Sequence, residues 1–215
     1  MDLKDIVIYG FGGFGREVAS LINHINSVKR QWNIIGFIDD GVAVGTENRY
    51  GKVLGDIHFL NSFASPLSVV IAIANPLLLK KITTSITNNL IDFPNLIADN
   101  VFYFDNESVS MGKGNIITNF CRLSCDVQIG NFNILNGSVS LGHDVQMKDF
   151  NVLFPDTRIS GQTRIGESNF FGARCFVNQC IEIGNDVKVS AGSYVMRSIR
   201  NSGLYAGNPA RNVEF

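Results

Sequence analysis

The chain has 215 residues, of which 45% are hydrophobic and 17% are charged, and its formal net charge at pH 7 is −1. This composition is typical of a globular protein with its own core, and the near-neutral charge argues against a basic surface for nucleic acid. No apolar run reaches the roughly 18 residues of a membrane-spanning helix, so we expect no membrane span.

The first residues form a short charged lead into a strand and do not resemble a secretory signal. We therefore expect a cytoplasmic protein with reduced thiols. The four cysteines are Cys121, Cys125, Cys175 and Cys180. Cys121 and Cys175 occupy positions of an internal repeat and are predicted to fill the core. We expect no metal site, because no nearby histidine completes a zinc-binding set.

The first part of the chain alternates strands and helices. In chain order we expect a strand over 6–9, a glycine turn over 10–15, a helix over 16–25, a strand over 33–38, a strand over 68–74 and a helix over 77–89. Strand, glycine turn, helix and strand form the opening of a Rossmann-like parallel sheet. The pattern stops near residue 94, and residues 1–95 are predicted to form an α/β domain.

The glycine turn is a candidate binding loop. Such turns let a phosphate approach the backbone N–H groups at a helix N-terminus. Asp39 and Asp40 follow the second strand, where an acid that binds a ribose or a base would lie. This arrangement alone suggests NAD, but the segment before the repeat is too short for a full dinucleotide fold. A turn with a purely structural role is the alternative.

The second part repeats every six residues, with a bulky apolar residue at each sixth position. These residues are Met111, Ile117, Leu123, Ile129, Leu135, Leu141, Met147, Leu153, Ile159, Ile165, Phe171, Val177, Ile183, Val189 and Val195. A period of six fits neither a helix nor an alternating strand. It fits a chain that turns a corner every six residues, and we expect the apolar residues at the corners.

A longer period sets the shape of this part. Four asparagines recur eighteen residues apart, at Asn115, Asn133, Asn151 and Asn169. Three hexads then make one coil, so the coil is a triangular prism, and stacked coils let the asparagines form a ladder. The fifteen hexads make five coils. Residues 96–200 are therefore predicted to form an all-β parallel β-helix.

The hexads and the segment Gly207–Arg211 resemble the hexapeptide-repeat acyltransferases, and the whole chain is similar to their sugar-modifying branch. That branch contains the nucleotide-aminosugar N-acetyltransferases of the bacillosamine, perosamine and viosamine pathways and the sialic-acid O-acetyltransferases. The resemblance implies an N-terminal Rossmann-like α/β domain followed by a left-handed parallel β-helix. It also implies that residues 201–215 form a tail close to coenzyme A.

His143 is the first candidate for catalysis. An imidazole has its pKa near working pH, so it can take a proton from an attacking amine. Asp144 could orient the ring, and the Gly-His-Asp sequence resembles the catalytic histidine and adjacent carboxylate of the family. The other histidines, His24 and His58, fall outside the coil. A backbone N–H, possibly that of Gly161, could hold the oxyanion during direct transfer.

The resemblance implies further site residues. Those expected beside the acetyl-CoA co-substrate are Gly161, Ala173 and Ala191, spaced along one side of successive coils, with Gly207, Pro209 and Arg211 in the tail. Those expected to bind the nucleotide-linked sugar are Gly12, Gly13, Phe14, Asp39 and Asp40. Enzymes of this type are homotrimers with sites between coils, so we expect a homotrimer.

Together these features predict an acetyl-CoA-dependent N-acetyltransferase of a nucleotide-linked 4-amino-4,6-dideoxysugar. One departure stands out: relatives often carry a second histidine nine positions after the first, where this chain has Val152. Relatives also often have histidine where Phe14 stands. An O-acetyltransferase of sialic acid or another sugar, and a catalytically silent sugar-nucleotide-binding protein, remain alternatives, as does an NAD enzyme.

Overall fold

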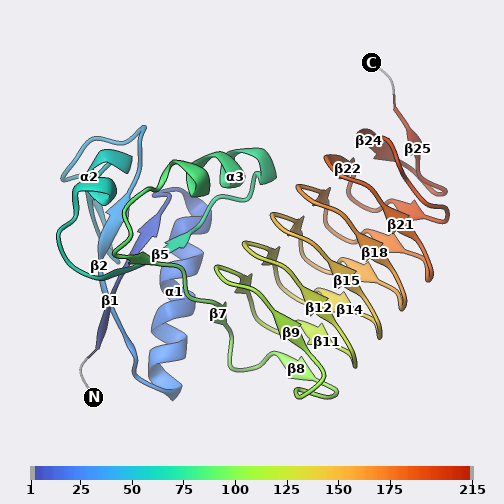
Figure 1. Ribbon diagram of the computed structural model, residues 1–215, viewed down its shortest axis with the longest axis horizontal. Helices are drawn as coiled ribbons and strands as arrows, with labels where there is room; N and C mark the ends of the chain where they lie inside the picture. Colours follow the sequence, from blue (N-terminus) through green and yellow to red (C-terminus); the bar gives the residue numbers. More distant parts are fainter. Residues whose placement is uncertain (1–2, 214–215) are drawn as a thin grey trace.

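The computed structural model describes residues 3–213, which form an α/β unit followed by a β-helix (Figure 1). The strands of the first sheet are β1 (Lys4–Tyr9), β2 (Trp32–Ile38), β3 (Glu47–Asn48), β4 (Gly51–Gly55), β5 (Leu67–Ile71) and β6 (Ile91–Asp92); the helices are α1 (Gly13–Val28), α2 (Ile57–Ser62) and α3 (Pro76–Ser85). The sheet order is β3-β4-β2-β1-β5-β6, and every pair except β3–β4 is parallel. The predicted Rossmann-like sheet is confirmed.

Capping residues explain where two of the helices begin. Asn75 precedes α3, and its side-chain oxygen accepts a hydrogen bond from Leu78 N at 3.1 Å, while Pro76 takes the first helical position. Asp56 caps α2 in the same way. The predicted helix over 77–89 ends at Ser85, four residues early.

The second unit is a three-sided prism of short parallel strands. The first face contains β7 (Leu96–Ile97), β10 (Ile116–Ile117), β13 (Ile134–Leu135), β16 (Val152–Leu153), β19 (Phe170–Phe171), β22 (Val187–Val189), β24 (Gly203–Ala206) and β25 (Arg211–Asn212). The second contains β8 (Phe102–Tyr103), β11 (Arg122–Leu123), β14 (Ser140–Leu141), β17 (Arg158–Ile159), β20 (Phe176–Val177) and β23 (Tyr194–Val195). The third contains β9 (Ser110–Met111), β12 (Gln128–Ile129), β15 (Gln146–Met147), β18 (Arg164–Ile165) and β21 (Glu182–Ile183). The predicted triangular coil is confirmed.

The prediction that the bulky apolar residues lie at the corners is wrong. Each is the last residue of a strand and points into the prism, as the full burial of Leu123 and Leu135 shows. The corners lie three residues later, where the backbone adopts positive φ at Phe120, Asp126, Phe132, Ser138, Asp144, Phe150, Asp156, Gln162, Ser168, Arg174, Cys180 and Asp186. The apolar side chains belong in the strands because only the flat faces direct them toward the shared core.

The predicted asparagine ladder is present inside the prism. The side-chain oxygen of Asn133 accepts hydrogen bonds from the backbone N and Nδ2 of Asn151, at 2.9 and 3.1 Å. Asn133 donates in the same way to Asn115, and Asn169 donates to Asn151. These buried amides satisfy one another coil by coil, which fixes the register of the stack.

The α/β unit covers the first face of the prism. The outward residue of each strand is exposed and polar on the third face, as at Gln128 and Arg164. On the first face the outward residues Ile116, Ile134 and Val152 are at most 1% exposed. Helices α1 and α3 lie between the first sheet and the β-helix in Figure 1. The packing of apolar side chains therefore joins the two units.

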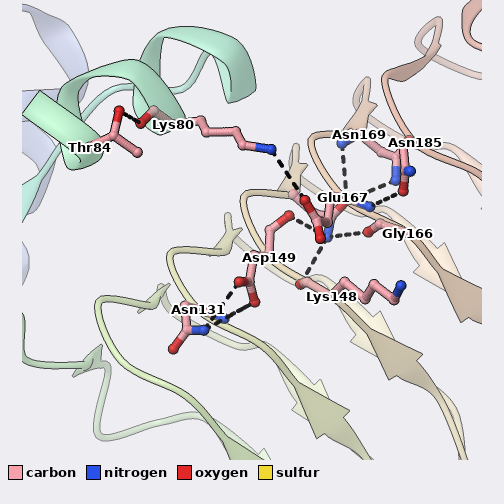
Figure 2. Close-up of polar contacts among 10 residues, drawn as sticks. Lys80, Thr84, Asn131, Lys148, Asp149, Gly166, Glu167, Asn169 and Asn185 are labelled. Carbon is pink, nitrogen blue, oxygen red and sulfur yellow. Dashed lines mark hydrogen bonds and ion pairs between the residues drawn. The ribbon is translucent and has the colours of Figure 1, made fainter.

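Polar contacts accompany this packing along the edge between the third and first faces. Lys80 extends from α3, and its Nζ lies 3.2 Å from Glu167 Oε2 (Figure 2). Glu167 follows Asn131 and Asp149 on the same edge, where Asp149 Oδ1 accepts a hydrogen bond from Asn131 N at 2.7 Å. Lys80 and Glu167 are both about half exposed, so their ion pair is expected to contribute little beside the apolar contact.

The last strands cap the open end of the prism. β24 pairs with β22 in parallel, and β25 folds back antiparallel onto β24. This closes the exposed edge of the first face, as a solenoid requires. Among residues 3–213, the longest helices are too short or too polar to cross a lipid bilayer.

Candidate functional site

His143 and Asp144 form the turn between β14 and β15, on the edge between the second and third faces. His143 Nδ1 lies 2.8 Å from Asp144 Oδ2. Both side chains are open to solvent, at 61% and 51% exposure. Asp144 has a φ of 59°, a conformation that Asp tolerates better than most residues, so the turn itself directs the carboxylate at the ring.

Gly161 lies one coil beyond His143 on the same edge, and the ring rests on it. A Cβ atom placed on Gly161 would lie 2.6 Å from His143 Nε2, which is too close for any side chain. The His143 carbonyl accepts a hydrogen bond from Gln162 N at 2.8 Å. Within residues 3–213 the Gly161 N–H donates no hydrogen bond. The structure therefore brings His143, Asp144 and Gly161 together.

Cys125 lies on this edge too, one coil before His143, although no cysteine is near His143 in sequence. The Asp144 N–H donates to the Cys125 carbonyl at 3.0 Å. The eighteen-residue period was the signal that places Cys125 there. Beside Asp144, a groove of about 410 Å³ opens on the third face; its lining residues are Asp144, Gln146, Gln162, Arg164, Cys180 and Glu182.

The prediction that Gly161, Ala173 and Ala191 follow one side of the coils is wrong for Gly161. Ala173 and Ala191 stack on the edge between the first and second faces, where Gly192 N donates to the Ala173 carbonyl at 2.8 Å. Gly161 lies on the next edge, because twelve residues separate it from Ala173 and only a spacing of eighteen returns to the same edge. The second face, with β17 and β20, lies between them.

The tail from Gly207 to Arg211 folds onto the last coil. Tyr194 N donates to the Gly207 carbonyl at 3.0 Å, and Ala210 N donates to the Tyr194 carbonyl at 2.8 Å. Gly207 N donates to Ser193 Oγ at 3.1 Å. Arg211 is exposed in β25. The tail thus adjoins the second face at the end where Ala191 lies.

The glycine turn joins β1 to α1, and its glycines have different roles. A Cβ on Gly15 would lie 1.9 Å from the Gly10 carbonyl oxygen, so Gly15 allows the helix to approach the strand closely. Gly12 caps α1 without any side-chain hydrogen bond. A Cβ on Gly12 would meet nothing within 4 Å, and one on Gly13 only an arginine tip. The space above the helix N-terminus is therefore open. Phe14 is partly buried against the core.

Asp39 and Asp40 follow β2 beside this turn, and both accept hydrogen bonds from the protein. Asp39 Oδ2 accepts from Phe11 N at 2.9 Å and so holds the glycine turn. Asp40 Oδ2 accepts from the Tyr9 hydroxyl at 2.5 Å. Burial, followed by this hydrogen bond, raises the pKa of Tyr9 well above its usual value. These bonds are local structure that the sequence pattern did not reveal.

The candidate residues form separate groups in one copy of the chain. The glycine turn belongs to the unit that covers the first face, whereas His143 lies on the edge away from that face. Val152, where relatives often have a second histidine, is a fully buried outward residue of the first face. His143 and position 152 thus lie on different sides of the prism.

The cysteines and acidic residues indicate no metal centre. Cys121 and Cys175 are buried in the prism, and burial raises the pKa of Cys121 to about 12 and also raises that of Cys175. Within residues 3–213 no three His, Cys, Asp or Glu side chains are grouped so that they could hold a metal ion. The prediction that Cys121 and Cys175 fill the core is confirmed.

Comparison with known proteins extends these observations. Residues 5–86 match the PglD N-terminal domain family. A comparison with curated protein sequences gives no match. Among solved structures, the acetyltransferase domain of PglB from Neisseria gonorrhoeae is 25% identical, with a TM-score of 0.89 over 98% of this chain and 100% of that chain. The same domain has been solved with acetyl coenzyme A.

Two further structures match over almost the whole chain. WeeI from Acinetobacter baumannii is 27% identical, with a TM-score of 0.86 over 98% of this chain and 100% of that chain. A perosamine N-acetyltransferase variant from Caulobacter crescentus, in complex with CoA and GDP-perosamine, shares the fold at 22% identity and a TM-score of 0.86, over 100% of this chain and 99% of that chain. The chain therefore combines a PglD-type N-terminal domain with a left-handed parallel β-helix, and over almost its whole length it is similar to sugar acetyltransferases with the hexapeptide-repeat fold.

Proposed function

We propose that this protein is an acetyl-CoA-dependent N-acetyltransferase that acts on the amino group of a nucleotide-linked 4-amino-4,6-dideoxysugar. One observation carries the proposal: an exposed His143–Asp144 pair lies over Gly161 at an open edge of the prism. Its context supports it, since PglB binds acetyl coenzyme A and the perosamine enzyme binds CoA and GDP-perosamine.

The geometry of the pair supports a different role for each nitrogen of the ring. With Nδ1–H donating to Asp144, the lone pair of Nε2 is free to act as the base. Nε2 takes the proton of the attacking amine, and the Asp144 carboxylate stabilises the imidazolium that forms. The same proton then goes to the departing thiolate of coenzyme A. This direct transfer needs no covalent acyl-enzyme.

Gly161 complements the base. Its N–H makes no hydrogen bond within residues 3–213 and lies one coil from the ring, so it can donate to the developing oxyanion. Its missing side chain leaves room for the imidazole ring of His143. The site thus combines the parts that an acyl transfer needs: His143 as the base, Asp144 as the carboxylate that orients it, and the Gly161 N–H as a free donor.

The co-substrates have separate candidate surfaces. Ala173 and Ala191 leave a smooth edge along which a pantetheine arm can lie, and the exposed Arg211 of the tail can meet a phosphate. Pro209 and Gly207 shape that tail. The open space above Gly12 and Gly13 suits a diphosphate at the N-terminus of α1. Asp39, Asp40 and Phe14 flank this space and are assigned to the nucleotide.

A homotrimer would join these surfaces. The large exposed apolar residues of the β-helix all lie on or beside the second face: Phe102, Phe104, Phe120, Phe176 and Met196. Such a concentration on one face is typical of a contact between proteins. A contact there brings the His143 edge of one copy toward the alanine edge of another. The separation of His143 from the glycine turn in one copy favours a site between copies.

Release of free thiol from acetyl-CoA, measured with UDP-, GDP- and dTDP-linked 4-amino-4,6-dideoxysugars, tests the proposal. We expect one of them to be acetylated, and His143→Asn to lower kcat by about 10²- to 10⁴-fold, as loss of a general base does. His58→Asn, at an exposed histidine on α2, is the matched control and should keep full activity. No turnover with any sugar, or full activity of His143→Asn, would refute the proposal.

A further inference from the structure

We propose that the cleft between the start of α3 and the far end of the first face binds a phosphorylated monosaccharide. The cleft has a volume of about 230 Å³, and its lining residues are Ala74, Asn75, Pro76, Leu77, Ser168, Phe170, Asp186 and Lys188. It begins beside Glu167, whose contact with Lys80 is drawn in Figure 2. It lies away from His143, on the opposite side of the prism.

The first observation is an unpartnered hydroxyl. Ser168 lines the cleft and is only 5% exposed, yet its Oγ has no hydrogen-bond partner within residues 3–213. Buried polar atoms are almost always hydrogen-bonded, so an unpaired buried hydroxyl indicates that a bound molecule supplies the missing partner. Because Ser168 lines the cleft, a ligand bound there can supply that partner.

The second observation is a set of groups that favour an anion. Lys188 is exposed at the rim of the cleft and forms no ion pair within residues 3–213. The N-terminus of the ten-residue helix α3 also faces the cleft, and its positive end favours negative charge. Asn75 already caps Leu78 N, while Leu77 N donates no hydrogen bond within the described residues. Ammonium, N–H and hydroxyl suit a phosphate.

The remaining lining favours a sugar attached to that phosphate. Phe170 and Pro76 give an apolar floor for the C–H face of a ring, and Asp186 supplies a carboxylate that can accept from sugar hydroxyls. The small volume fits one ring and not a nucleoside as well. The ligand can be a free sugar phosphate or the sugar–phosphate end of a nucleotide-linked sugar.

Calorimetric titration of the full chain with glucose 1-phosphate, glucose, inorganic phosphate and UDP-glucose tests the site. We expect saturable binding of glucose 1-phosphate, tighter than that of phosphate or glucose. Lys188→Gln should weaken it about tenfold, and Ser168→Ala about fivefold, as loss of a charged and a neutral hydrogen bond do. Lys148→Gln, an exposed lysine outside the cleft, is the matched control and should bind like the parent.

The outcomes distinguish a free sugar phosphate from the sugar–phosphate end of a nucleotide-linked sugar. They also distinguish failure of the proposed cleft from failure of the proposed acetyltransferase activity. If the cleft takes a free sugar phosphate, Lys188→Gln weakens glucose 1-phosphate alone, and UDP-glucose binds alongside it. If it takes the end of a nucleotide sugar, Lys188→Gln weakens both, and the two compete. Absence of binding to the parent, or equal binding by parent and both cleft variants, would overturn the site.

Thermal unfolding verifies that each variant is folded. A protein that binds sugar phosphate but transfers no acetyl group would refute only the proposed enzyme activity.

Discussion

The imidazole of His143 rests on a glycine, and this contact holds the ring beside Asp144. A methyl group in place of the Gly161 hydrogen would lie 2.6 Å from Nε2 and would turn the ring away. We expect Gly161→Ala to lower kcat/KM by about 10²-fold, the usual cost of a catalytic group displaced by 1 Å. The midpoint of thermal unfolding should change little, because the displaced ring is solvent-exposed.

Lys113→Ala is the control for this prediction. Lys113 occupies the same position of its hexad on the edge between the third and first faces, which the proposed site does not use, and its side chain is exposed. Its activity should match that of the parent. Equal activity of both variants would mean that the position of the His143 ring does not limit the reaction.

At the residue scale, the sequence predicted those groups whose position follows from the repeat. His143 and Asp144 are adjacent, so their pairing needed no knowledge of the fold. The hydrogen bonds of Asp39 with Phe11 and of Asp40 with Tyr9 were not predictable, because they depend on how two loops meet across the sheet. The separation of Gly161 from Ala173 follows from the period of eighteen, because the two residues are twelve positions apart.

Between elements, the contact of the α/β unit with the first face depends on apolar residues that point out of the prism. Ile134 is such a residue and is 1% exposed. Ile134→Ala should lower the free energy of unfolding by about 2–5 kcal/mol, as for a core position. Gln128 holds the same strand position on the third face and is exposed. Gln128→Ala should change the free energy of unfolding by less than about 0.5 kcal/mol, and equal effects of the two variants in denaturant titrations would contradict the packing.

At the element scale, the period of six predicted the fifteen short strands from β9 to β23, but neither where each begins nor the strands β7, β8, β24 and β25 on either side of them. Strand and corner both recur every six residues, so a period alone does not fix the phase. A second signal was present: no Val, Ile or Thr occupies any of the positive-φ positions from Phe120 to Asp186. Branching at Cβ makes that backbone conformation costly, so the absence of these residues marks the corners.

At the scale of the whole molecule, the sequence also indicates which face of the prism the α/β unit covers. Ile116, Ile134 and Val152 place an apolar residue at every eighteenth position, where the third face has glutamine or arginine. The cleft beside Ser168 could not be predicted from the sequence, because it depends on where α3 stops covering the first face. In the proposed homotrimer, the copy that would supply each half of the site is likewise a property of the assembly.

Gly12 offers a way to disable one half of the proposed site without touching the other. A Cβ there meets nothing, and Gly12 caps α1 without a side-chain bond, so Gly12→Asp should fold normally and even cap the helix. Its carboxylate would occupy the space assigned to the diphosphate and repel it. We use this variant together with His143→Asn, which leaves the glycine turn intact.

A site shared between copies predicts that two inactive variants restore each other. Gly12→Asp and His143→Asn should each be inactive alone. Co-expressed in equal amounts and assembled at random, they should regain roughly a quarter of the parent activity, because an intact site needs His143 from one copy and Gly12 from another, each present half the time. Mixing the purified, non-exchanging oligomers is the control and should restore nothing. If the co-expressed variants remain inactive while native mass spectrometry shows mixed trimers, both halves of the site belong to the same chain.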